Sequence, residues 1–272
     1  MVMTRLVVLL VIVCMALVFT SCGSSDATGN LSAEDRFELG KKKFEEEDYL
    51  EAISDFEIIK LQYPGSAVAD DAQFYLAECR FNMEEYLFAA EEYLSLRRSM
   101  PASSFVPLAQ YKVGLCYYRL SPKSSLDQKY TYRAIDEFQA FLEYYPQHEM
   151  ASEAEAKIKE LTAKLAKKLY DSAELYMKLG RYKAATDYFN SVLERYHDTP
   201  YADLAFIGKV KSLIVRKKYD EAKRDVDLFL EKYPNSHVKN EVEALKREIE
   251  EHLKTKSAVS TSKDRIDLTA KK

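Results

Sequence analysis

The sequence contains little glycine and little proline. Each occurs only seven times in 272 residues. A β-rich fold needs many tight turns, which are commonly built with these two residues, so their scarcity argues against β structure and favours helices. Tyr, Phe, Ala, Glu and Lys are abundant instead, and the chain is long enough for one extended domain or two compact domains.

Motifs that would indicate catalysis are also missing. The chain has no H-E-x-x-H metal motif, no glycine-rich phosphate loop and no G-x-S-x-G nucleophile elbow. The histidines are separated from one another in sequence: His148, His197, His237 and His252. Only a catalytic constellation assembled in three dimensions stays open. We therefore expect a protein that is not an enzyme and that has no cofactor and no metal site.

The first 21 residues have the layout of a secretion signal. Arg5 supplies a positive charge, and residues 6–19 are apolar but too few to span a bilayer, which takes about 20 residues. Cys22 follows, and residues 22–32 resemble a flexible tether. The arrangement resembles a bacterial lipoprotein signal, in which cleavage leaves the cysteine as the acylated first residue. An ordinary secretory signal with a chance cysteine is the alternative.

The net charge and the remaining cysteines limit which partners and which disulfide bonds are possible. The formal net charge is −4, so no global basic field would recruit nucleic acid. Apart from Cys14 in the signal and Cys22, only Cys79 and Cys116 remain. A bridge between these two stays open in an oxidising compartment. Two small buried thiols on apolar helix faces are the favoured interpretation.

An internal repeat organises the rest of the chain. Five anchors begin similar segments: Tyr49, Tyr86, Thr131, Tyr182 and Tyr219. Three residues after each anchor stands an alanine: Ala52, Ala89, Ala134, Ala185 and Ala222. Large apolar residues follow at offsets 7 and 10, and proline ends most copies at offset 15. These offsets lie on one helical stripe, and the alanine permits close helix packing.

Each copy is preceded by another apolar-periodic segment, so the repeating unit is a helix pair. We predict an all-α fold, a right-handed α-solenoid of five pairs over residues 33–254. Residues 121–130 insert a polar loop into the third pair, and one long helix free of breakers joins the third pair to the fourth. Residues 255–272 lack aromatics and periodicity, which predicts a disordered tail.

The run YMKLGRYKAATDYF resembles the tetratricopeptide repeat. With the lipoprotein signal, the long helix and segments such as LQYPGSAVADDAQFYLAECRFNMEEYLFAAEEYLSL, nearly the whole mature chain resembles the BamD family of outer-membrane β-barrel assembly. The resemblance implies a lipid-anchored scaffold that faces the periplasm from the outer membrane. In that family, residues corresponding to 33–148 would receive the aromatic-ending strand of unfolded barrel proteins. Residues corresponding to 149–254 would dock the POTRA domain of the BamA insertase.

Candidate binding residues follow from the repeat register. Four aromatic residues of first helices are predicted to form peptide pockets: Phe74, Phe81, Tyr111 and Tyr117. Aromatic residues at this spacing also commonly form the solenoid core. Tyr188 stands about where many relatives carry an insertase-contacting arginine, which puts that charge pairing in doubt. A scaffold of another envelope system, such as a secretin pilotin or a Tol–Pal accessory, is the alternative function.

Overall fold

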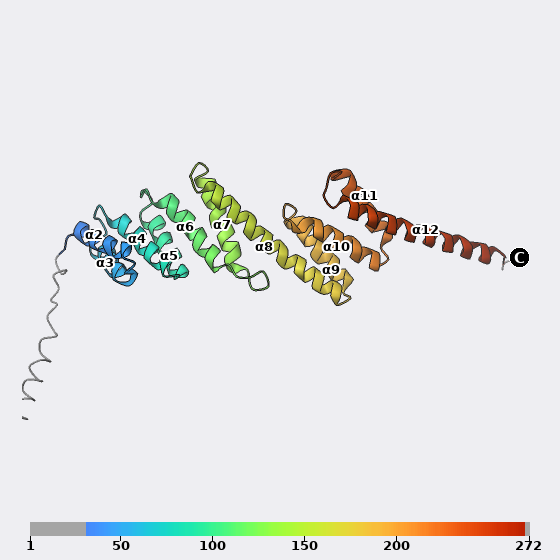
Figure 1. The fold of residues 1–272 in the computed structure, drawn as a ribbon, viewed down its shortest axis with the longest axis horizontal. Helices are drawn as coiled ribbons and strands as arrows, with labels where there is room; N and C mark the ends of the chain where they lie inside the picture. The colour runs from blue at the N-terminus through green and yellow to red at the C-terminus, as the bar shows by residue number, and fades with distance from the viewer. Residues whose placement is uncertain (1–30, 270–272) are drawn as a thin grey trace, which may run out of the picture. The chain divides into compact units, whose positions relative to one another are not determined.

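The computed structural model describes residues 31–269 and the side chains through residue 256. Within this range the chain is helical, and its helices run in the order expected for consecutive pairs (Figure 1). The helices are α2 (Ala33–Glu45), α3 (Tyr49–Gln62), α4 (Ala69–Asn82), α5 (Tyr86–Ser99), α6 (Val106–Leu120), α7 (Lys129–Tyr144), α8 (Ala151–Lys178), α9 (Tyr182–Arg195), α10 (Tyr201–Val215), α11 (Tyr219–Lys232) and α12 (Lys239–Thr269). The predicted all-α fold of tetratricopeptide-like helix pairs is confirmed.

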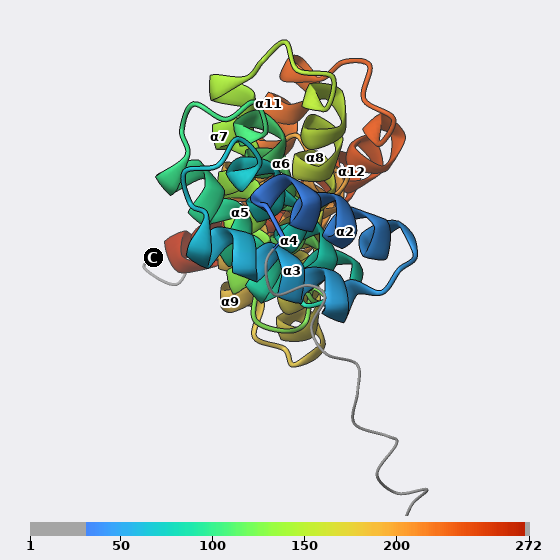
Figure 2. The ribbon, with the colours of Figure 1, turned by 90° about the vertical axis from the view of Figure 1, so that its left-hand side faces the viewer.

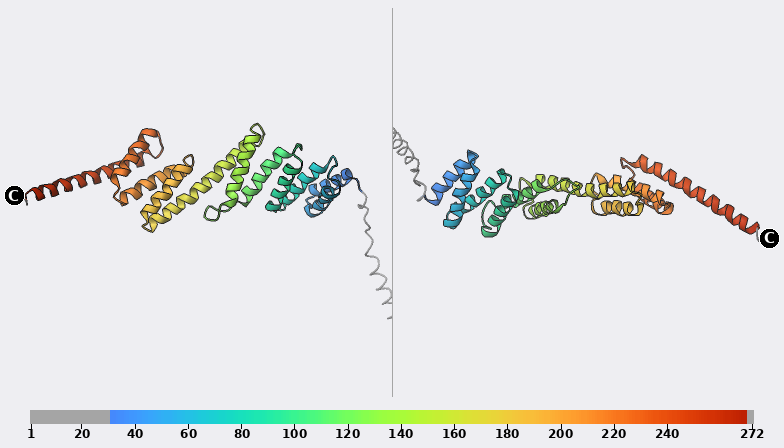
Figure 3. Two further views of the ribbon diagram at one scale, coloured as in Figure 1. Left: turned by 180° about the vertical axis from the view of Figure 1, so that it is seen from behind. Right: turned by 90° about the horizontal axis from the view of Figure 1, so that it is seen from below.

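The chain divides into two compact units, the first ending at Phe105 and the second beginning at Val106. The first unit holds the pairs α2/α3 and α4/α5, and the second holds α6/α7, α8/α9, α10/α11 and then α12. In the first unit α2 and α3 lie side by side (Figure 2), and within the second unit α8 and α9 do so (Figure 3). The contact-based boundary differs from the functional division predicted between residues 148 and 149.

Alanine and glycine residues allow neighbouring helices to approach closely. All five repeat alanines are completely buried. Glycine has the same role at Gly40 and Gly114, where an added Cβ would lie 2.8 and 2.7 Å from the rings of Phe56 and Phe138. The rings of Phe56 and Phe138 therefore pack against positions of the first helices that carry no side chain, as close packing requires.

The helix ends follow the chemistry of the repeat. The side chain of Ser32 accepts a hydrogen bond from Asp35 N at 3.0 Å and caps α2. Tyr63 ends α3 and Tyr233 ends α11, each with a proline as the next residue. In four of the helix pairs, the turn after the first helix contains a residue with a left-handed backbone conformation: Glu47, Glu84, Gly180 and Lys217.

The predicted insertion and the predicted long helix are both present, and they contact each other. α8 has 28 residues and continues from the third pair to the fourth. The loop between α6 and α7 is held by Gln128, whose amide donates to Lys123 O and Leu126 O, both at 2.9 Å. Lys168 of α8 donates to the same Leu126 carbonyl at 2.7 Å. The buried Gln128 amide thus holds the insertion together, and the Lys168 ammonium group ties it to the long helix.

The C-terminal end differs from the prediction. Helix α12 extends from Lys239 to Thr269, whereas the sequence predicted that the repeats end at residue 254 and that a disordered tail follows. No glycine or proline interrupts residues 239–269, so nothing in the chain stops the helix earlier. Val242, Leu245 and Ile249 bury one side of α12 against α10 and α11.

Candidate functional site

The four predicted pocket aromatics belong largely to the core. Phe74, Tyr111 and Tyr117 are only 7%, 3% and 4% exposed, so their rings pack in the interior of the structure. Phe81 is half-buried against the edge of Tyr86. A contact role for the four residues is not tested by their burial and stays a prediction.

Covering side chains from neighbouring elements explain this burial. Phe105, at the end of the first unit, stacks on Phe74 with ring centroids 4.5 Å apart. Tyr111 contacts the rings of Phe138 and Phe141 on α7 at 5.6 and 5.5 Å. Burial raises the pKa of Tyr111, and the nearby Glu153 carboxylate raises it further. The phenol therefore stays neutral and structural.

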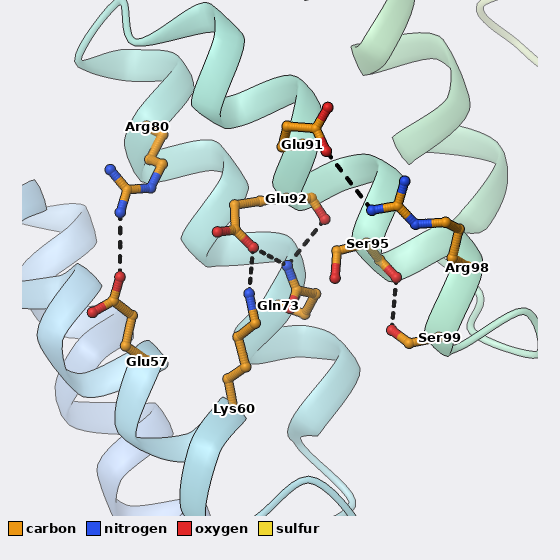
Figure 4. A network of polar contacts seen from close by, with 9 residues as sticks. All are labelled: Glu57, Lys60, Gln73, Arg80, Glu91, Glu92, Ser95, Arg98 and Ser99. Atoms are coloured by element: carbon orange, nitrogen blue, oxygen red, sulfur yellow. Dashed lines mark hydrogen bonds and ion pairs between the residues drawn. The ribbon is translucent and has the colours of Figure 1, made fainter.

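A second recurring position, six residues after each anchor, carries an acidic residue in four copies. In the second copy, the Glu92 carboxylate accepts from Gln73 Nε2 at 2.7 Å and from Lys60 at 2.6 Å (Figure 4). In the first copy Asp55 accepts from Arg36 at 2.9 Å. The same arrangement joins Glu137 to Gln110 and Asp225 to Lys209. Each carboxylate is thereby satisfied inside its own unit.

The fourth copy is the exception, because it carries Tyr188 at this position. The Tyr188 ring stacks on Tyr176 of α8, with ring centroids 5.2 Å apart and 27° between planes. Leu175 on α8 and Leu179, the residue that follows its last turn, lie four positions apart and are 55% and 62% exposed. We call Leu175, Tyr176, Leu179 and Tyr188 the tyrosine surface. The offset-six comparison would have revealed this exception from the sequence alone.

In the first unit, the exposed large apolar side chains lie on α3 and α5, the second helices of their pairs. Phe74 and Phe81, by contrast, lie on the first helix α4. Leu50 and Leu61 on α3 are 69% and 78% exposed, and Leu87 and Phe88 on α5 are 46% and 62% exposed. Arg80 lies over the Phe88 ring at 5.4 Å and pairs with Glu57 of α3 (Figure 4). We call Leu50, Leu61, Leu87 and Phe88 the α3–α5 surface.

The cysteine and histidine side chains are engaged in packing and local hydrogen bonding. Cys79 and Cys116 are buried thiols that form no disulfide, as favoured from the sequence, and burial raises the pKa of Cys79 to about 12. His148 accepts a hydrogen bond from Met150 N, and His252 stacks on Tyr219. In the described part of the chain no His, Cys, Asp and Glu side chains gather as metal ligands would. Nor does any described helix combine the length and apolarity that crossing a membrane requires.

Comparison with known proteins decides the family. The family YfiO, described as outer membrane lipoprotein, matches residues 30–214, which is more than half of the chain. The chain belongs to the YfiO family. It is 28% identical over 120 residues to the outer membrane protein assembly factor BamD of Rickettsia prowazekii (strain Madrid E). That match covers 44% of this chain and 48% of the relative, so the chain spans about half the length of the curated relative it matches.

Solved tetratricopeptide-repeat structures are also similar at low identity. A tetratricopeptide repeat protein from Parabacteroides merdae is 14% identical with a TM-score of 0.36, covering 87% of this chain and 79% of its own. The TPR2AB domain of yeast Sti1, in its complex with pHSP90, is 15% identical with a TM-score of 0.36. It covers 80% of this chain and 98% of that chain.

The YfiO match leaves both ends of the chain outside it. Cys22, the predicted lipid attachment residue, precedes the matched range and also lies outside the residues that the structure describes. At the other end the match stops at residue 214, one residue before α10 ends. Helices α11 and α12 therefore follow the part of the chain that the YfiO family shares.

Proposed function

We propose that this YfiO-family chain is a non-catalytic scaffold of outer-membrane β-barrel assembly. It binds unfolded outer-membrane proteins and a BamA-like insertase and brings them together at the membrane. The observation that carries the proposal is the family match over residues 30–214, a range filled by paired helices. The relative named as an assembly factor, matched over part of its length, supports the same role.

The first unit is proposed to hold the unfolded substrate through the α3–α5 surface. Its four side chains are large, apolar and open to solvent. Burying one such side chain stabilises a complex by about 1.5–3 kcal/mol, so a few of them reach the roughly 8 kcal/mol of micromolar binding. Binding of that strength is weak enough for the substrate to pass on. Phe74 and Phe81, which belong to the same unit, would then support the surface from below.

The second unit is proposed to dock the POTRA domain of the insertase through the tyrosine surface. Tyr188 stands where the family resemblance placed a charged contact, and in this chain the position is aromatic and stacked. Contact with a partner would bury Leu175 and Leu179, which are more than half exposed. An apolar, aromatic contact replaces the ion pair in this account, in keeping with the enrichment of aromatic residues at interfaces.

Lipid attachment at Cys22 is proposed to hold the scaffold on the outer membrane, facing the periplasm. The YfiO family consists of outer membrane lipoproteins, and Cys22 follows the signal-like segment directly. A single myristoyl-sized chain anchors only marginally, so stable attachment takes at least two chains. The segment after Cys22, predicted from its composition to be a tether, would then let the first unit reach substrates.

Replacement of the native protein by variants tests these assignments in cells. Depletion should lower the amount of folded barrel proteins in the outer membrane, and wild type should restore it. Tyr188→Ala with Leu175→Ser should lose the insertase on purification, whereas Leu204→Ser, at an exposed leucine of α10, should retain it. Unchanged barrel protein after depletion contradicts the proposal. Recovery of a secretin or of Tol components would instead assign the chain to another envelope system.

A further inference from the structure

A cavity of about 310 Å³ lies between α10, α11 and the end of α9. Its apolar wall consists of Leu193, Phe206, Leu228 and Phe229, and Ala202 opens onto it from the start of α10. Phe206 and Phe229 stack with ring centroids 4.2 Å apart and form a continuous aromatic floor. Ligand pockets in proteins begin at about 300 Å³, so the space suits one large side chain.

The fifth copy of the repeat, which contains α11, differs from the other four at one buried position. Seven residues after the anchor, the first four copies carry an aromatic ring: Phe56, Tyr93, Phe138 and Phe189. The fifth copy carries Val226 at this position. Val226 is fully buried but lacks a ring, so the fifth copy has less bulk at this position than the other four.

Most charged side chains around the cavity have a polar partner within the described residues. Lys209 pairs with Asp225 at 2.8 Å, and His237 faces Asp203 at 3.3 Å. Lys232 lies over the ring of Tyr233 at 5.4 Å and forms no ion pair with a carboxylate of the described residues. The rim therefore offers one ammonium group to an acidic group from outside.

We propose that this cavity receives an aromatic side chain of a partner polypeptide, and that a carboxylate beside that side chain pairs with Lys232. Aromatic anchors in preformed pockets carry much of the energy of protein interfaces. The inference rests on the proposed function only for the source of the polypeptide, a component of the assembly machinery. The cavity lies next to the end of the family-matched range, so it would add a contact beyond the tyrosine surface.

The absence of tryptophan from the chain provides a direct assay. The probe is the blocked peptide Ac-Gly-Ser-Trp-Glu-Ser-Gly-amide, excited where tyrosine does not absorb and titrated with the purified mature protein. Entry of its indole into the cavity shifts the emission to shorter wavelength. A peptide with alanine at the aromatic position, competing against the probe, should not displace it. Failure of the emission to shift at saturating protein overturns the proposal.

Two variants locate the binding. Ala202→Phe fills the cavity and should weaken the probe at least about tenfold, whereas Ala156→Phe, at an exposed position of α8, should leave it unchanged. Lys232→Glu should weaken the glutamate probe about twofold to fivefold and favour a probe with lysine in its place. Equal affinity for Ala202→Phe and Ala156→Phe contradicts the proposal. The assay needs no insertase, so its failure and that of the proposed function are distinguishable.

Discussion

Gly208 of α10 lies directly against the ring of Phe189 of α9: a Cβ on Gly208 would come within 2.3 Å of Cζ. Phe189 is fully buried and its ring has no open side to move into. The contact joins the fourth helix pair to the fifth and permits the backbones to approach. Residues 201–215 consequently depend on this one glycine for their position.

Gly208→Ala is expected to destabilise the protein by about 1–3 kcal/mol, because the added methyl group overpacks the α9–α10 contact. The measurement is urea unfolding followed by circular dichroism. Gly65→Ala is the control, since nothing lies within 4 Å of a Cβ at that position. Equal stability of the two variants would show that the ring moves freely, contrary to this packing.

The left-handed turns inside the pairs predict opposite effects of two substitutions. Gly180 has φ +68°, and Glu84 occupies the equivalent turn with φ +61°. A left-handed conformation costs a side chain of L configuration about 1–2 kcal/mol. Gly180→Ala should therefore lower the melting temperature, and Glu84→Gly should raise it. A decrease in both variants would mean that backbone entropy outweighs the strain at residue 84.

The buried carboxylate of Asp55 balances two cations. It accepts hydrogen bonds from Arg36 and Lys43, both at 2.9 Å, and only 6% of its side chain is exposed. Asp55→Asn should cost about 3–5 kcal/mol, the range for breaking a buried pair. Lys43→Met is the control with a smaller expected loss, because Arg36 still pairs with the carboxylate. Urea unfolding of both variants decides between these expectations.

Acid should weaken the attachment of α12. A hydrogen bond from Lys223 and an ion pair with Lys246 lower the pKa of Asp227 in the folded protein. A lowered folded pKa contributes stability above the unfolded carboxyl pKa, and that contribution is lost as the pH falls through the folded value. Because the pair is partly exposed, we expect about 0.2–1 kcal/mol. Asp227→Asn should flatten the acid limb of stability against pH, and an unchanged slope would refute the assignment.

Cys22→Ser should release the mature protein from membranes into the soluble periplasm, because the acyl chains would have no attachment site. Membrane fractionation and the mass of the N-terminal peptide are the measurements. A serine variant that still sediments with membranes and carries acyl mass would show that the anchor lies elsewhere.

The sequence predicted well where one stripe of residues decides the structure. The alanine three residues after each anchor predicted a buried contact, and Ala52 through Ala222 are completely buried in all five copies. The absence of breakers between Ala151 and Lys178 predicted the long α8 correctly. In both cases the spacing within one helix contains the needed information.

Exposure of the first helices could not be predicted in this way. α4 contacts α3 on one side and α5 on the other, so more than one of its faces is buried. Phe74 is covered by Phe105, which lies outside the repeat stripe and is brought there by the turn after α5. Periodicity marks an apolar face but does not say which neighbour covers it, so the burial of these aromatic rings could not be predicted from it.

The most direct measurement is affinity purification of the full-length protein from native membranes in detergent, with mass spectrometry of its partners and of its N-terminal peptide. The account predicts a BamA-like insertase in stoichiometric amount together with an acylated Cys22. An acylated protein recovered without the insertase, from membranes that contain it, would contradict the assembly role.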